Sequence, residues 1–97
     1  MKQRKLGHTD VMVSEMGLGC MSFGPRISEA ESFKRMNDYV ELGGNFFDTA
    51  NIYGRSPDGK SEAGESERII GRWLKETGKR QDIVLASKVG FPYPGIA

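Results

Sequence analysis

The stretch Asn45–Gly54 reads NFFDTANIYG and places an acidic residue directly behind an apolar run. NFFD is rich in aromatic residues, as β-strands often are, yet the strand that it predicts ends on Asp48. Tyr53 follows on the next loop, just before a glycine. A carboxylate is a poor end for an apolar strand, because burying a charge without a partner is costly. Asp48 and Tyr53 are therefore candidates for a chemical role.

Two helices are predicted on either side of this stretch. Ser28 and Glu31 have the spacing of a capping box, and an apolar stripe follows them at helical spacing. A second apolar stripe ends at Gly78, and glycine is common just after a helix. The stripes consist of Phe33, Met36 and Tyr39 or Val40 in the first helix, and of Ile69, Ile70, Trp73 and Leu74 in the second.

The full set of predicted elements alternates between strands and helices. Strands separated by helices of about 10–15 residues indicate right-handed βαβ units and a parallel sheet. In chain order we expect a β-hairpin over Lys5–Ser14 that turns at Gly7–Asp10, a strand around Met16–Leu18, a helix from Ser28 to Gly43–Gly44, the strand NFFD (45–48), a polar loop over Gly54–Gly64, a helix from Ser66 or nearby to Gly78, and the strand IVLASKV (83–89).

Parallel α/β chains mostly form either an open doubly wound sheet or a (β/α)8 barrel. An open sheet that binds a dinucleotide would carry G-x-G-x-x-G at its first strand-to-helix turn. Residues 17–22 read GLGCMS, with serine where the third glycine belongs, so this motif is absent. A barrel carries its site on the loops at the carboxyl ends of its strands. Asp48, Tyr53 and Lys88 all fall at such positions.

Alternation along the strands brings two of these groups together. Side chains alternate between the two faces of a strand, so Asp48 and Phe46 share the barrel face while Phe47 faces the helices. In the last strand, Lys88 shares its face with Ala86. Neighbouring strands would then hold an aspartate and a lysine at one mouth, with a tyrosine above them.

These three groups suggest a proton donor. A phenol is weakly acidic at neutral pH, but a nearby ammonium stabilises the phenolate that remains after proton transfer. Asp48 would keep Lys88 charged and in place. Each residue also has an ordinary explanation: a turn carboxylate, a half-buried loop aromatic, and a solvated charge at a strand end. Their joint occurrence on adjacent strand ends favours the chemical interpretation.

The composition limits what the protein can bind. Of 97 residues, 28% are charged and 37% are hydrophobic, which is typical of a globular protein. A net charge of +1 gives no electrostatic reason to bind nucleic acid or an anionic membrane. No apolar run reaches the roughly 20 residues of a membrane span. The single cysteine, Cys20, excludes an intramolecular disulfide, and we expect a cytoplasmic protein.

Nearly the whole sequence resembles the N-terminal third of the aldo-keto reductases. The matching segments are RKLGHTDVMVSEMGLGCMSFG (4–24), FFDTANIYG (46–54), ESERIIGRWLKE (65–76) and DIVLASKV (82–89), and GLGCMSFG and IIGRWLKE are closest to the aryl-alcohol-dehydrogenase-like branch. The resemblance implies an α/β fold that is the N-terminal portion of a (β/α)8 TIM barrel. This portion would hold three barrel strands, two helices and a leading β-hairpin that plugs the bottom.

The resemblance also implies a reaction. Members of the family reduce an aldehyde or ketone to an alcohol by hydride transfer from NADPH. Asp48, Tyr53 and Lys88 match three of the four catalytic residues, with Tyr53 as the proton donor. The residues implied to approach the cofactor are Gly19, Cys20, Met21 and Asp48. Gly19 could instead be needed for the geometry of a turn, and Cys20 could be a small buried hydrophobic residue.

Other family features have no counterpart in this sequence. The fourth catalytic residue is a histidine on a later strand, whereas the only histidine here is His8, expected in the hairpin turn. The loops that bind the adenosine 2′-phosphate also come later, so NADPH over NADH rests on the resemblance. The loop Gly54–Gly64 is expected to shape the substrate entrance. No residues predict a metal site, and nothing indicates an oligomeric state.

The end of the sequence bears on the domain prediction. FPYPGIA (91–97) is typical of a loop between elements. We therefore expect residues 1–97 to be the N-terminal fragment of a single NADP-dependent barrel domain, inactive and poorly folded by itself. Two alternatives stay open. The same fold serves as a regulatory, cofactor-binding subunit of potassium channels, and the chain could also be a truncated, inactive product.

Overall fold

The computed structural model describes residues 1–92, and the last five residues of the predicted terminal loop lie outside this range. None of the helices in this range has the length and apolar character needed to cross a membrane. The elements are β1 (Gln3–Lys5), β2 (Met12–Ser14), β3 (Leu18–Gly19), α1 (Glu29–Glu41), β4 (Phe46–Asp48), α2 (Glu65–Thr77), the 3-10 helix η1 (Arg80–Asp82) and β5 (Val84–Ala86).

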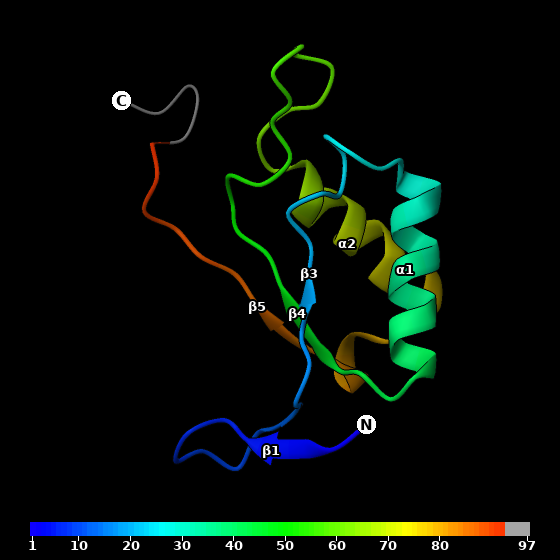
Figure 1. Ribbon diagram of the computed structural model, residues 1–97, viewed down its shortest axis with the longest axis vertical. Helices are drawn as coiled ribbons and strands as arrows, with labels where there is room; N and C mark the ends of the chain where they lie inside the picture. The colour runs from blue at the N-terminus through cyan, green and yellow to red at the C-terminus, as the bar shows by residue number, and fades with distance from the viewer. Residues whose placement is uncertain (93–97) are drawn as a thin grey trace.

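The predicted hairpin is present. β1 and β2 pair antiparallel, with Arg4 opposite Val13, and the turn between them contains Gly7 at a φ of 59°. The first arm begins at Gln3 rather than at Lys5. Figure 1 shows the hairpin beneath the end at which the other strands begin. This is the place that a plug at the bottom of a barrel would occupy.

The remaining strands form a parallel sheet in the order β3-β4-β5. The register places Leu18 beside Phe47 and Phe47 beside Leu85, so these side chains share a face. Both helices cover that face, and α1 packs beside α2 (Figure 1). The predicted order of hairpin, β, α, β, α, β is therefore confirmed, and within residues 1–92 only η1 was not predicted.

Two strand predictions were wrong in their bounds. β3 begins at Leu18, two residues after the predicted start at Met16. The Met16 carbonyl accepts hydrogen bonds from the side chains of Ser14 and Tyr39, so it is engaged outside the sheet. β5 ends at Ala86, so Lys88 lies beyond the strand instead of at its end. Beyond Ala86 the two segments stay linked by single hydrogen bonds, because the Thr49 N–H donates to the Ala86 carbonyl at 2.9 Å and the Asn51 N–H to the Lys88 carbonyl at 3.0 Å.

The helix ends follow the predicted signals closely. The Ser28 side chain accepts a hydrogen bond from the Glu31 N–H at 3.1 Å, as expected of an N-cap, and Gly43 follows α1 at a φ of 94°. α2 begins at Glu65, one residue before the predicted Ser66, and ends at Gly78 with a φ of 69°. Residues other than glycine rarely adopt this left-handed conformation, which is why glycine ends both helices.

The core lies between the sheet and the two helices. Phe47 is completely buried, and its ring lies 5.8 Å from that of Tyr39 on α1 and 5.4 Å from that of Trp73 on α2. This confirms that Phe47 faces the helices. Burying such a side chain contributes about 1.5–3 kcal/mol, so β4 is held by its central residue while Asp48 remains exposed.

Candidate active site

Asp48 and Lys88 meet at the carboxyl end of the sheet, as predicted. Lys88 Nζ donates a short hydrogen bond to Asp48 Oδ1 and a second, of 2.9 Å, to the Thr49 carbonyl. The two side chains remain 48% and 55% exposed. The hydrogen bond to Asp48 raises the pKa of Lys88 above its ordinary value, although desolvation opposes it, and Tyr53 adds to the increase. Lys88 is thus held as a cation.

Tyr53 lies beside this pair. Lys88 Nζ is 5.1 Å from the centroid of the Tyr53 ring, within the range of a cation–π contact. The Tyr53 backbone is fixed to the start of α2, because its carbonyl accepts hydrogen bonds from the N–H groups of Gly64 and Ser66 at 3.1 and 3.2 Å. The three residues predicted from the sequence are therefore brought together from three separate segments.

The glycine that follows Tyr53 is required by its surroundings. Gly54 has a φ of 128°, which L side chains rarely adopt. A Cβ at this position would lie 2.7 Å from the Glu62 carbonyl oxygen and 2.7 Å from the Glu65 backbone nitrogen. The chain can therefore turn away from Tyr53 and pass close against α2 only with glycine at this position.

A buried hydroxyl network beneath the site was not predicted from the sequence. The Ser66 hydroxyl donates to the Cys20 carbonyl at 2.7 Å, so the Thr49 hydroxyl, 2.8 Å away, must donate to Ser66. Thr49 and Ser66 are completely buried. The network connects the loops after β3 and β4 with α2, and Thr49 also supplies the carbonyl that binds Lys88. The adjacency of Thr49 to Asp48 was the only signal available in the sequence.

The predicted cofactor-approaching residues lie in different environments. Gly19 pairs with Asp48 across the sheet, is exposed, and has open space where a Cβ would lie. The Met21 side chain is 58% exposed. The Cys20 side chain is completely buried, and desolvation raises the pKa of its thiol from 9.0 to about 12. Its backbone is buried as well, because the N–H donates to the Asp48 carbonyl and the carbonyl accepts from the Ser66 hydroxyl. The structure therefore does not place Cys20 where a ligand could touch it, contrary to the prediction.

Two hollows adjoin Tyr53. The first, of about 210 Å³, lies on the Lys88 side and has apolar walls that include Ile52, Val89 and Phe91. The second, of about 420 Å³, lies toward the loop after β3 and includes Met21. Tyr53 contributes to both. A small molecule could therefore reach the phenol from either side.

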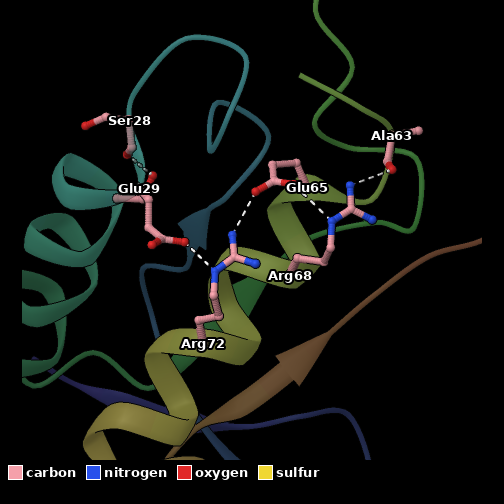
Figure 2. A network of polar contacts seen from close by, with 7 residues as sticks. Ser28, Glu29, Ala63, Glu65, Arg68 and Arg72 are labelled. Carbon is pink, nitrogen blue, oxygen red and sulfur yellow. Dashed lines mark hydrogen bonds and ion pairs between the residues drawn. The ribbon is translucent and has the colours of Figure 1, made fainter. Parts of the chain in front are cut away.

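The loops that carry the site are held by an ion-pair network between the helices (Figure 2). Arg72 binds Glu29 at the start of α1 and Glu65 at the start of α2, the latter at 2.8 Å. Arg68 binds Glu65 at 2.9 Å and the Ala63 carbonyl at 3.2 Å. Partial burial of Glu65 acts to raise its pKa, but the bonds from Arg68 and Arg72 outweigh this and lower it. Glu65 stays ionised and links both helix starts.

His8 takes no part in the site. It is exposed in the turn between β1 and β2, as predicted, and this turn belongs to the hairpin at the opposite end of the sheet (Figure 1). Within residues 1–92, no group of three or more His, Cys, Asp or Glu side chains is placed to hold a metal ion.

Comparisons with known proteins identify relatives of this chain. The model of the family described as "Aldo/keto reductase family" matches residues 15–96. The chain is 44% identical over 93 residues to "Uncharacterized oxidoreductase YrpG" of Bacillus subtilis and 41% identical over 90 residues to "Uncharacterized oxidoreductase YqkF" of the same organism. These matches cover 95% and 93% of this chain but only 27% and 26% of the relatives.

Solved structures give the same result. The aldo-keto reductase AKR11C1 from Bacillus halodurans, in its holo form, is similar with a TM-score of 0.74 and 44% identity. The match covers 93% of this chain and 26% of that one, so the chain spans about a quarter of the length of its relatives. The hairpin and three parallel strands correspond to the N-terminal portion of a (β/α)8 barrel. The chain belongs to the aldo/keto reductase family.

Proposed function

We propose that this chain supplies the proton donor of an NADPH-dependent reductase that converts an aldehyde or ketone to an alcohol. The observation that carries the proposal is the ion pair of Lys88 and Asp48, with the Lys88 ammonium 5.1 Å from the centroid of the Tyr53 ring. The family match and relatives named as oxidoreductases support it. The protein would act in the cytoplasm on a small carbonyl compound.

In the proposed mechanism each residue has one task. The carbonyl carbon gains a hydride while Tyr53 donates its phenolic proton to the carbonyl oxygen, which completes the alcohol. The phenolate left on Tyr53 is stabilised by the Lys88 ammonium and regains a proton from solvent. Asp48 keeps Lys88 charged and oriented, as its hydrogen bond indicates.

The residues present fit a nicotinamide nucleotide. Asp48 is half exposed and could accept a hydrogen bond from a ribose hydroxyl, and the open space above Gly19 leaves its backbone accessible. The exposed Met21 would border the same region, whereas the buried Cys20 would not contact the nucleotide. When bound, the reduced nicotinamide supplies the hydride. NADPH rather than NADH follows from the resemblance of the sequence to the family.

The substitution Tyr53→Phe in the intact protein tests this function. It removes the proton donor and keeps the ring, so the rate of 4-nitrobenzaldehyde reduction should fall about 10²–10⁴-fold. NADPH binding, measured by fluorescence titration, should change little. Unchanged turnover in the variant would exclude Tyr53 as the acid. A protein that binds NADPH but reduces none of a panel of carbonyl compounds would instead indicate a regulatory subunit.

We further propose that residues 1–97 belong to a single barrel domain and are inactive in isolation. The outer edges of β3 and β5 have no strand neighbour within residues 1–92, and Val89 and Phe91 are 85% and 77% exposed. Open edges and exposed apolar residues favour aggregation. A thermal melt of the purified chain with and without NADPH tests this. A cooperative transition that rises with NADPH would show a self-sufficient domain.

A further inference from the structure

The larger hollow beside Tyr53 has an unbalanced charge. Its lining includes Arg26, from the loop after β3, and Arg55, from the loop after β4, together with Met21, Ile52 and Tyr53. Both arginines are exposed. We refer to this hollow as the arginine hollow. Its volume of about 420 Å³ lies within the range of ordinary ligand pockets, roughly 300–1,000 Å³.

Arg26 and Arg55 differ from the arginines of α1, α2 and the hairpin, although Arg80 of η1 bonds a carbonyl rather than a carboxylate. Across residues 1–92, neither guanidinium forms an ion pair with a carboxylate. The acid nearest to Arg55 in sequence, Asp58, accepts from the Ser56 hydroxyl at 2.5 Å and the Lys60 N–H at 3.0 Å. The acid nearest to Arg26, Glu29, pairs with Arg72. By contrast, Arg4, Arg35, Arg68 and Arg72 each pair with a glutamate.

The two hollows beside Tyr53 therefore differ in charge. In the smaller one, the charge of Lys88 is matched by Asp48. In the arginine hollow, no acidic residue lines the wall among the described residues, so the positive charge of Arg26 and Arg55 has no compensating acid there. A guanidinium presents its N–H donors in a planar fork that matches the two oxygens of a carboxylate. The chemistry of the wall thus favours an anionic ligand.

We propose that Arg26 and Arg55 make the enzyme select carbonyl substrates that carry a carboxylate. The reacting carbonyl would lie at Tyr53, the carbon skeleton against Met21 and Ile52, and the carboxylate at the two arginines. This inference rests on the proposed function and names the substrate class of the same site. It concerns residues that take no part in proton transfer, so their loss affects binding rather than chemistry.

The test compares an anionic aldehyde, 4-formylbenzoate, with its neutral methyl ester, in the intact protein with NADPH. Wild type should prefer the carboxylate. In the Arg26→Gln/Arg55→Gln double variant, kcat/KM for 4-formylbenzoate should fall about 10-fold or more through KM, while the ester changes less than about twofold. Arg26→Lys/Arg55→Lys should keep most of the preference, and added salt should weaken it. Arg35→Gln, on the outer surface of α1, is the matched control.

A second measurement separates this inference from the proposed function. Binding of terephthalate, followed by ligand-observed NMR, needs no turnover and should be lost in the double glutamine variant. Reduction of the ester by wild type, without carboxylate preference or terephthalate binding, would overturn the inference and leave the function standing. Terephthalate binding that needs both arginines, without reduction of either aldehyde, would overturn the proposed function and leave the anion-binding inference standing. Equal losses for both aldehydes, or weaker NADPH binding in the double variant, would also overturn the inference.

Discussion

The two ends of β4 carry polar networks of opposite character. At its start, the Tyr39 hydroxyl lies 2.7 Å from the Ser14 hydroxyl and accepts from the Phe46 N–H at 3.2 Å. Ser14 and Tyr39 are only 2% and 9% exposed. At its end, Asp48 and Lys88 are charged and about half exposed. One short strand thus separates a neutral, buried network from an ionised, accessible one.

The difference shows that the start of β4 contributes to the stability of the fold, whereas its end holds the accessible groups of the candidate site. The buried network joins the hairpin to the sheet and to α1, because Asn45 also accepts from the Ser14 N–H at 2.7 Å and donates to the Met12 carbonyl at 2.9 Å. Buried polar atoms need partners, and such a network specifies one arrangement. The exposed pair leaves reactive groups free for a ligand, as at the carboxyl face of barrels.

The largest effect is expected at the ionised end. Lys88→Met should lower the reduction rate of the intact enzyme about 10²–10⁴-fold and alter its pH dependence, because the phenolate loses its neighbouring cation. Asp48→Asn should cost less, since it loosens Lys88 without removing it. Kinetics of both single variants and of the double variant check this. Effects that add in log rate would show that the two residues do not act as a unit.

A substitution next to Tyr53 should affect both the stability of the fold and the rate of reduction. Gly54→Ala should destabilise the intact protein by about 2–5 kcal/mol, through backbone strain and overpacking, and should displace Tyr53. Denaturant unfolding and kinetics measure the two effects. Gly59→Ala is the matched control, since Gly59 also has a positive φ, of 75°, but open space around it. Similar losses at both positions would show that packing against α2 contributes nothing.

Replacing a tyrosine by phenylalanine in each of the two networks compares them directly. Tyr39→Phe should cost about 1–3 kcal/mol of unfolding free energy, because it leaves buried partners of the hydroxyl without a hydrogen bond. It should leave kcat nearly unchanged. Tyr53→Phe should do the opposite, with full stability and a large loss of rate. If Tyr39→Phe reduced the rate as strongly as the stability, the two networks would be coupled through β4.

The smallest effect concerns Cys20, which is buried although it follows β3 at the carboxyl end of the sheet. Its thiol should resist iodoacetamide at pH 8.5 in the folded protein and react after denaturation. Because burial raises its pKa from 9.0 to about 12, the unfolded state loses this proton first as the pH rises. Cys20 therefore makes stability fall between about pH 9 and 12, and Cys20→Ala should flatten that slope. Rapid alkylation of the folded protein would contradict this.

Local signals allowed much of the fold and site to be predicted. Ser28 with Glu31 marked the start of α1, and Gly78 marked the end of α2, because caps act through hydrogen bonds between near neighbours. Asp48 and Tyr53 stood out because they are polar groups that follow an apolar strand. Periodicity also placed Phe47 toward the helices, since the two faces of a strand alternate along the sequence itself.

Only the tertiary structure decided what depends on neighbours far along the chain. β5 ends at Ala86, where its pairing with β4 ends at Asp48, and no local pattern in IVLASKV records the extent of that pairing. The hydrogen bonds of the Tyr39 hydroxyl could not be predicted for the same reason. Periodicity assigns it to a buried face, whereas its hydroxyl finds Ser14, Met16 and Phe46 only after the hairpin, α1 and β4 have packed together. The hydroxyls of Thr49 and Ser66 likewise meet only because α2 folds back against the loop after β4.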